Sequence, residues 1–237
     1  MAHKDSYVIG VDEAGLGPIL GPLVVAGVRV NARHVSILQR LGVRDSKLFS
    51  NYKQSRLKRK LVWRRARLLL QNFQIRTISA NEIDDAYLRG ITMYDLEVRA
   101  VAEILDKLKW QTAKTIYLHQ LGQTRKNKFF QKLHEHDSRF FSKSFSSKVV
   151  YEMYADRIYI PVSAASILAK VTRDALVDRI CQKAGEEYVS GYSNNNTVKF
   201  LRRYLERHHA LPLATRRTRN WKPLRELISE EQTINSF

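Results

Sequence analysis

The chain has 237 residues, with 41 lysines and arginines against 23 aspartates and glutamates, which gives a formal net charge of +18. That length suits one domain with a modest appendage, and a hydrophobic content of 44% excludes a disordered polyelectrolyte. A single cysteine, Cys181, excludes a fold held by intrachain disulfides, and the most apolar stretch, residues 19–30, is shorter than the ~20 apolar residues of a membrane helix. We therefore expect a cytoplasmic protein with no membrane partner, whose excess positive charge favours binding to a polyanion.

The first two predicted elements are strands. Residues 7–11 (YVIGV) form a short apolar run that ends in acids, and residues 23–30 (LVVAGVRV) form a second run rich in β-branched residues. The segment between them is rich in glycine and proline, as turns are. This pattern predicts an antiparallel pair at the start of a sheet.

Two amphipathic helices are predicted next, separated by a strand over residues 73–79. The helix over residues 53–70 has Leu57, Leu61 and Leu68 at helical spacing and a basic outer face. The helix over residues 92–109 places apolar side chains on its inner face and charged ones outside. Its predicted inner residues are Val98, Val101, Leu105 and Leu108, and its predicted outer residues are Glu97, Glu103, Asp106 and Lys107.

The remaining elements complete an α/β pattern. Strands are predicted over residues 115–118, which end at His119, and over residues 149–153, and a helix follows over residues 163–180. Residues 123–138 are predicted to be a helix or an insertion, and residues 197–207 a basic helix. Alternating strands and helices indicate a mixed sheet flanked by helices, with a basic helical appendage at the C-terminus.

Basic residues gather in three segments, residues 53–67, 125–132 and 202–222. Most charge runs are solvated helix faces, but three clusters with few compensating acids favour a nucleic-acid partner. Aromatic side chains lie within the last cluster, where they could stack on bases or belong to a core. These are Phe200, Tyr204 and Trp221.

Adjacent carboxylates occur where the first strand meets the glycine-rich turn, at Asp12 and Glu13. Two ionised acids at the edge of a core repel each other and lose hydration, and a cation relieves both penalties. Carboxylate oxygens suit Mg²⁺ or Mn²⁺. The alternative is an acid pair that caps the turn.

The residues around this pair resemble type 2 ribonuclease H, the ribonuclease HII family, in its archaeal and eukaryotic branch. The opening GVDEAGLGP at residues 10–18, followed by GPLVVA at residues 21–26, is similar to the family's G-x-D-E-A-G-R-G-P and G-P-x-V-x-A. DSK at residues 45–47, PVSAASILAKVTRD at residues 161–174 and GY at residues 191–192 match further motifs in the family's order. The resemblance extends from residue 7 to about residue 225.

This resemblance implies a ribonuclease H fold over residues 1–185 as the catalytic domain, with residues 186–237 as a basic C-terminal helical and loop region packed on it. It implies a metal-dependent endoribonuclease that cleaves the RNA strand of RNA/DNA hybrids, or ribonucleotides embedded in DNA, by two-metal-ion hydrolysis that leaves a 3′-hydroxyl. The family uses four carboxylates, of which Asp12, Glu13 and Asp156 match three. Asp174, at the end of the signature helix, is expected to be structural.

His119 occupies the position of the family's remaining aspartate, within YLHQLG at residues 117–122. A neutral imidazole can bind a metal, but it brings no negative charge, and Mn²⁺ accepts nitrogen more readily than Mg²⁺ does. We therefore expect Asp12, Glu13, His119 and Asp156 to be the catalytic and metal-binding residues, with Mn²⁺ preferred. Asp137 is the nearest acid that could substitute, but it lies in a polar stretch.

The resemblance also implies the substrate-binding residues. The family's G-R-G motif contacts the 2′-hydroxyl of a ribonucleotide through its backbone. The corresponding residues in this chain are Gly15, Leu16 and Gly17, with leucine in place of arginine. Tyr192 is expected to pack on the sugar and Lys47 to contact a phosphate. Turn geometry alone could explain Gly15 and Gly17.

Two functions follow from these residues. In the first, the chain is an active hybrid ribonuclease that works as a monomer. In the second, it is a catalytically degenerate relative that binds hybrid or duplex nucleic acid with little hydrolysis, because loss of a metal ligand costs much of the rate. The presence of five residues that match the family's site favours the enzyme, and these are Asp12, Glu13, Lys47, Asp156 and Tyr192.

Overall fold

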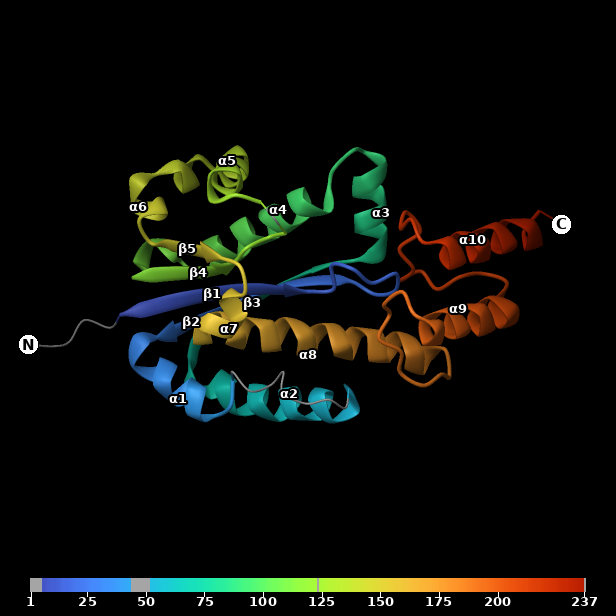
Figure 1. Cartoon of the computed structure of the whole chain (residues 1–237), viewed down its shortest axis with the longest axis horizontal. Helices are drawn as coiled ribbons and strands as arrows, with labels where there is room; N and C mark the ends of the chain where they lie inside the picture. Colours follow the sequence, from blue (N-terminus) through green and yellow to red (C-terminus); the bar gives the residue numbers. More distant parts are fainter. Residues whose placement is uncertain (1–5, 44–51, 123, 237) are drawn as a thin grey trace, which may run out of the picture. The chain divides into compact units, whose positions relative to one another are not determined.

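Five strands form one mixed sheet, in the order β3-β2-β1-β4-β5 (Figure 1). The computed structural model describes residues 6–43, 52–122 and 124–236. The strands are β1 (Tyr7–Ala14), β2 (Leu23–Asn31), β3 (Leu70–Ile78), β4 (Thr115–His119) and β5 (Val149–Glu152). β1 pairs antiparallel with β2 and parallel with β4, and β4 pairs parallel with β5. The predicted mixed sheet, with its antiparallel opening pair, is confirmed.

Helices flank the sheet and follow the predicted pattern. Those within the described residues are α1 (Val35–Arg40), α2 (Tyr52–Ala66), α3 (Ala80–Leu88), α4 (Met93–Lys107), α5 (Lys126–His136), α6 (Lys143–Ser146), α7 (Ala155–Ile158), α8 (Ile160–Lys183), α9 (Asn195–His208) and α10 (Lys222–Ile234). No helix in these ranges is both long and apolar enough to cross a bilayer.

Two glycines let helices approach the sheet closely from its two faces. A Cβ atom at Gly10 would lie 2.2 Å from the carbonyl carbon of Pro161, at the start of α8. A Cβ atom at Gly27 would lie 2.4 Å from Ile104 of α4. Gly27 pairs with Val11, the neighbour of Gly10, and successive residues of a strand point to opposite faces. The start of α8 and α4 therefore pack on opposite faces of the sheet (Figure 1).

The sequence pattern misassigned the inner face of α2. Leu57 and Leu61 are 63% and 53% exposed, and Leu68, just beyond the helix, is 78% exposed. The smaller Val62 and Ala66 are buried instead. The prediction that the leucines lie on the inner face was wrong. The buried face of α2 carries smaller side chains instead.

The pattern on α4 was correct for its apolar residues and wrong for one acid. Val98, Val101, Leu105 and Leu108 are all buried, as predicted. Glu97 was expected outside, but it is only 4% exposed. It lies one helical turn before Val101, so the two share a face of the helix.

The chain divides into two compact units. Unit 1 comprises Met1–Ala14, Val24–Arg76 and Tyr94–Val171, and unit 2 comprises Gly15–Leu23, Thr77–Met93 and Thr172–Phe237. The predicted division into residues 1–185 and 186–237 stays a prediction.

Unit 2 has an apolar core of its own, which settles the role of the C-terminal aromatics. Phe200 is fully buried in this core, and Tyr204 and Trp221 pack against it. Of the two alternatives left by the sequence, the core is therefore the correct one for these three residues. The basic C-terminal segment is thus a folded layer with an apolar interior.

Candidate active site

β1 and β4 bring Asp12 and His119 together. The two strands are parallel, and Val11 pairs with Leu118, so the next residue of each strand lies at the same edge of the sheet. The Asp12 side chain is buried, and its Oδ1 lies 4.0 Å from Nδ1 of His119. This distance exceeds that of a hydrogen bond.

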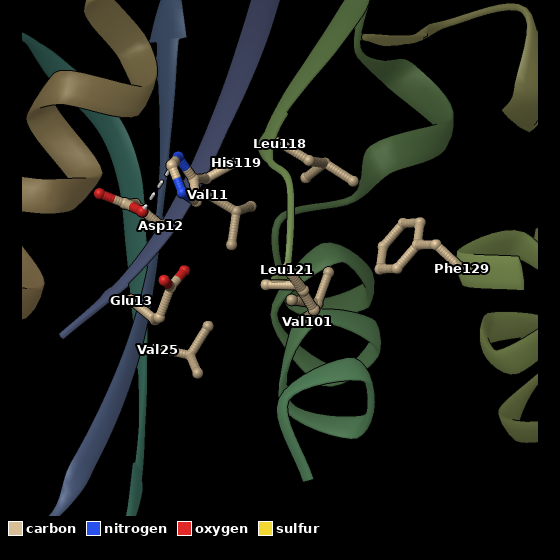
Figure 2. Close-up of a pocket in the computed structure, with 9 residues that line it drawn as sticks. All are labelled: Val11, Asp12, Glu13, Val25, Val101, Leu118, His119, Leu121 and Phe129. Carbon is tan, nitrogen blue, oxygen red and sulfur yellow. Dashed lines mark ion pairs between the residues drawn. The ribbon is translucent and has the colours of Figure 1, made fainter. Parts of the chain in front are cut away.

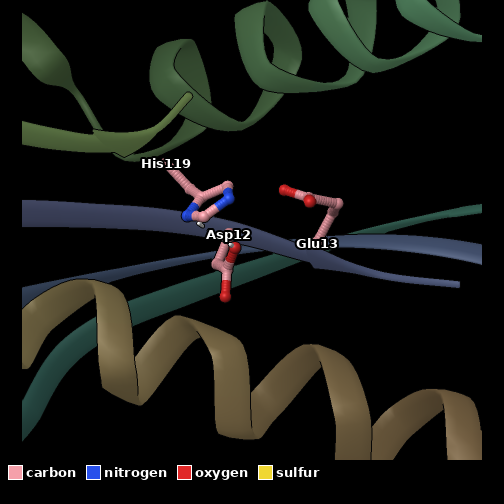
Figure 3. Close-up of side chains that lie close together, drawn as sticks. All are labelled: Asp12, Glu13 and His119. Carbon is pink, nitrogen blue, oxygen red and sulfur yellow. Dashed lines mark ion pairs between the residues drawn. The ribbon is translucent and has the colours of Figure 1, made fainter. Parts of the chain in front are cut away.

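Glu13 completes a group of three ligand atoms. It follows Asp12 in an extended strand and therefore leaves β1 on the opposite face, which is the face of α4 (Figure 3). One atom each from Asp12, Glu13 and His119 nevertheless lies within 4.8 Å of the other two. The structure thus brings together three of the four predicted catalytic residues.

A small cavity lies beside this group (Figure 2). Its volume is about 10 Å³, which is room for about one water molecule. Apart from Asp12, Glu13 and His119, its walls are apolar, and they consist of Val11, Val25, Val101, Leu118, Leu121 and Phe129. Such walls keep the local dielectric low, so charges in the group interact strongly with one another and with any cation.

Electrostatics in unit 1 favour a bound cation. Burial raises the pKa of Glu13 well above its ordinary value, and the negative charges of Asp12 and then Glu97 raise the pKa further. Carboxylates that repel one another in a site of low polarity are relieved by a divalent cation. The donor set of two carboxylates and one imidazole fits Mg²⁺ or Mn²⁺, and the nitrogen suits Mn²⁺ better.

Glu97 is the residue near this site that the sequence reasoning missed. Burial raises its pKa to about 8, and its Oε1 is buried with no hydrogen-bond partner among the described residues. The charge of Glu97 contributes to the raised pKa of Glu13. The spacing of four between Glu97 and Val101 was the available signal, since it places the acid on the inner face of α4.

Other acids named from the sequence lie outside the three-atom group. Asp156 lies in the first turn of α7, which contacts β4, and its role stays a prediction. Asp137 caps a short helical turn and pairs with Arg139 at 2.5 Å, so it does not replace the missing carboxylate. Asp174 accepts a hydrogen bond from the Tyr188 hydroxyl at 3.1 Å, as its expected structural role requires.

Within unit 2, the structure brings Gly17 and Tyr192 together. A Cβ atom at Gly17 would lie 3.7 Å from Cε1 of Tyr192, in ordinary contact. The carbonyl oxygen of Gly191 accepts hydrogen bonds from the amides of Ile19 and Leu20, at 2.8 and 3.0 Å, and this fixes the tyrosine beside the loop. The loop itself needs glycine at position 15, where φ is +100°.

One predicted substrate contact, Lys47, belongs to the DSK motif. Lys47, with the rest of the DSK motif at residues 45–47, lies outside the described residues. Its role as a phosphate contact stays a prediction.

Comparison with known proteins identifies the family. The profile of the family Ribonuclease HII matches residues 9–222. The chain belongs to the ribonuclease HII family. These proteins are metal-dependent endoribonucleases of the type 2 ribonuclease H class, and the resemblance drawn from the motifs is therefore confirmed.

Individual relatives agree over nearly the whole chain. The Ribonuclease HII of Thermococcus sibiricus is 36% identical over 224 residues, which covers 94% of this chain and 92% of the relative. The crystal structure of ribonuclease H2 from Pyrococcus horikoshii superposes with a TM-score of 0.77 at 29% identity and covers 98% of this chain and all of the other. Bst-RNase HIII, solved in complex with Mn²⁺, has the same fold at 16% identity, with a TM-score of 0.76 over 97% of this chain and 71% of its own.

Proposed function

We propose that the chain hydrolyses the RNA strand of RNA/DNA hybrids, and ribonucleotides embedded in duplex DNA, at a metal centre formed by Asp12, Glu13, His119 and Asp156. The observation that carries this proposal is the convergence of Asp12, Glu13 and His119 within 4.8 Å at the carboxyl ends of two parallel strands. Membership of the ribonuclease HII family supports it.

Each side chain of the proposed metal centre has a role that follows from its position. Asp12 and Glu13 approach from opposite faces of β1 and supply the negative charge that holds a divalent cation. His119 supplies a neutral nitrogen from the end of β4, and the apolar cavity walls limit the entry of bulk water. When bound, Mg²⁺ or Mn²⁺ would stabilise charge on the scissile phosphate and lower the pKa of the attacking water.

The ion preference follows from His119. Mg²⁺ binds oxygen ligands almost exclusively, whereas Mn²⁺ accepts imidazole more readily. We expect Mn²⁺ to support faster hydrolysis than Mg²⁺. A family member with aspartate at this position would lack that bias.

Substrate contacts come from the loop in unit 2. The backbone of Gly15, Leu16 and Gly17 would contact the 2′-hydroxyl of a ribonucleotide, and the ring of Tyr192, which is 45% exposed, would pack on its sugar. Lys47 would bind a phosphate. The chain is proposed to act as a monomer, and a cytoplasmic location stays a prediction drawn from the lone cysteine and the short apolar stretch.

A cleavage assay tests the proposal. A labelled RNA/DNA hybrid is incubated with the protein and Mg²⁺, then Mn²⁺, alongside the Asp12→Asn variant, and the product ends are mapped. We expect cleavage that is faster with Mn²⁺, yields 3′-hydroxyl ends and is lost in Asp12→Asn. Tight hybrid binding without cleavage by either ion would contradict the proposal and favour the role of a binding protein.

A further inference from the structure

Three arginines converge on the glycine-rich loop inside unit 2. The Arg216 side chain is fully buried and donates hydrogen bonds to the carbonyl oxygens of Gly15, Leu16 and Gly21, at 2.7, 3.2 and 2.9 Å. Arg219 donates a second hydrogen bond to the carbonyl oxygen of Leu16. We refer to Arg173, Arg216 and Arg219 as the arginine cluster.

Arg173 reaches the same loop from α8. Its guanidinium donates to the carbonyl oxygens of Leu20 and Ser190, at 3.3 and 3.0 Å. A Cβ atom at Gly15 would lie 2.7 Å from its Nε. The glycine therefore makes room for the guanidinium directly beneath the loop.

Among the described residues no carboxylate forms an ion pair with a member of this cluster, and the charge of Asp84 only partly offsets the lowered pKa of Arg216. The neighbouring Arg217, by contrast, forms an ion pair with Glu231. Burial lowers the pKa of Arg216 to about 9, and repulsion from Arg219 and Arg173 adds to this. Buried cations are normally paired, so a cluster of three arginines with no ion-paired carboxylate is suited to an external anion.

The cluster also retains hydrogen-bond donors. The Nε atoms of Arg173 and Arg219 are buried and have no hydrogen-bond partner among the described residues. Arg173 is only 3% exposed, and a buried donor without a partner costs about 1–3 kcal/mol. An anion bound at the surface beside Arg219 would supply negative charge to the cluster.

Arg219 is the member that reaches the surface. It is partly exposed, whereas Arg173 and Arg216 are buried. Asp84 holds the turn that carries it, because its carboxylate accepts hydrogen bonds from the amides of Arg217 and Thr218, at 2.8 and 3.1 Å. This turn thus presents a positioned guanidinium next to an exposed loop.

The exposed part of the loop is the segment that contacts nucleic acid in the proposed function. Gly17 is exposed, Tyr192 lies above it, and the Arg173 guanidinium is 5.2 Å from the centre of the Tyr192 ring. A sugar packed on the tyrosine would therefore lie beside the loop that the arginines contact.

We propose that Arg219, backed by Arg173 and Arg216, binds one backbone phosphate of the nucleic acid beside Gly17 and Tyr192. The proposal rests on the proposed function, since nucleic acid is the ligand. Arg219 would supply, from the C-terminal segment, a cationic group next to a position where this chain has the uncharged Leu16.

Salt-dependent binding tests this proposal with three variants. Arg219→Gln removes the charge and keeps a donor for the Leu16 carbonyl, and Arg219→Lys keeps the charge. Arg225→Gln, on the exposed face of α10 in the same unit, is the matched control. Binding to a fluorescent RNA/DNA hybrid is measured without metal by anisotropy, between about 50 and about 200 mM salt.

Arg219→Gln should weaken binding about tenfold and lower the slope of log Kd against log salt by about 0.9, because one phosphate contact is lost. Arg219→Lys should keep the slope, and Arg225→Gln should match the wild type. The proposal is overturned if Arg219→Gln has the slope of Arg225→Gln, or if the Gln and Lys variants lose affinity equally, which would indicate a structural brace. The proposed function is tested separately, because its failure would appear as a wild-type protein that does not cleave the hybrid in the cleavage assay.

Discussion

Replacing His119 with aspartate puts a third carboxylate beside Asp12 at the end of β4. If the new oxygen takes the place of Nδ1, it lies 4.0 Å from Asp12 Oδ1. At an effective dielectric constant of about 20, two unit charges at this distance repel by about 4 kcal/mol. Without metal, His119→Asp should therefore be less stable than the wild type, with a melting temperature lower by about 10 °C.

A bound divalent cation reverses the sign of this effect. At the same distance, the new charge attracts a doubly charged ion with about 8 kcal/mol, which exceeds the repulsion from Asp12. Desolvation of the carboxylate offsets much of the difference, so we expect Mg²⁺ affinity to rise by about ten- to a hundredfold. Hydrolysis with Mg²⁺ should rise as well, and the preference for Mn²⁺ should shrink.

Calorimetric titration of Mg²⁺ and Mn²⁺, thermal unfolding and hybrid cleavage measure these effects together. His134→Asp, which adds the same charge on the exposed face of α5, is the control and should change none of them. Equal Mg²⁺ affinity and equal Mg²⁺-supported cleavage in His119→Asp and the wild type would show that the side chain at position 119 does not act on the bound ion.

Three further predictions concern the same region. The folded-state pKa of Glu97 is raised to about 8, so its contribution to stability is complete below pH 4.5 and is lost as the pH rises to about 8, by about 1.4 kcal/mol per unit. Glu97→Gln should flatten the pH dependence of the metal-free unfolding free energy over that range, and an unchanged slope would count against a buried acid. Asp12→Asn should lower hybrid cleavage at least about a hundredfold and stabilise the metal-free protein by removing repulsion on Glu13, and lower stability in denaturant would contradict this. Gly10→Ala should cost at least about 3 kcal/mol in chemical denaturation, because its Cβ would meet the backbone of Pro161 at 2.2 Å, and near-wild-type stability would show that α8 can move away.

The sequence predicts the sheet and most of the helices because their patterns are local. Short apolar runs mark β1, β2 and β4, and the spacing of Val98, Val101, Leu105 and Leu108 marks the inner face of α4. Asp12 and His119 can be expected at one edge of the sheet, because each is the polar residue that directly follows a buried apolar run.

What the sequence misses is the burial of charged side chains. Glu97 and Arg216 stand among residues that look like solvated faces, since charged residues are rarely buried without a partner. Their environments depend on residues that are distant in the sequence. The charge of Glu97 raises the pKa of Glu13, and Arg216 donates a hydrogen bond to the carbonyl oxygen of Gly15, about 200 residues away. No local pattern encodes the contacts of Arg216, whereas the spacing between Glu97 and Val101 was a local signal for the burial of Glu97.

The measurement that tests the metal centre most directly is pulsed electron paramagnetic resonance of the protein loaded with Mn²⁺. We expect a nitrogen coupling from the His119 imidazole in the wild type, and its loss in His119→Asp with Mn²⁺ still bound. A wild-type spectrum with oxygen ligands alone would contradict the role of His119 as a metal ligand.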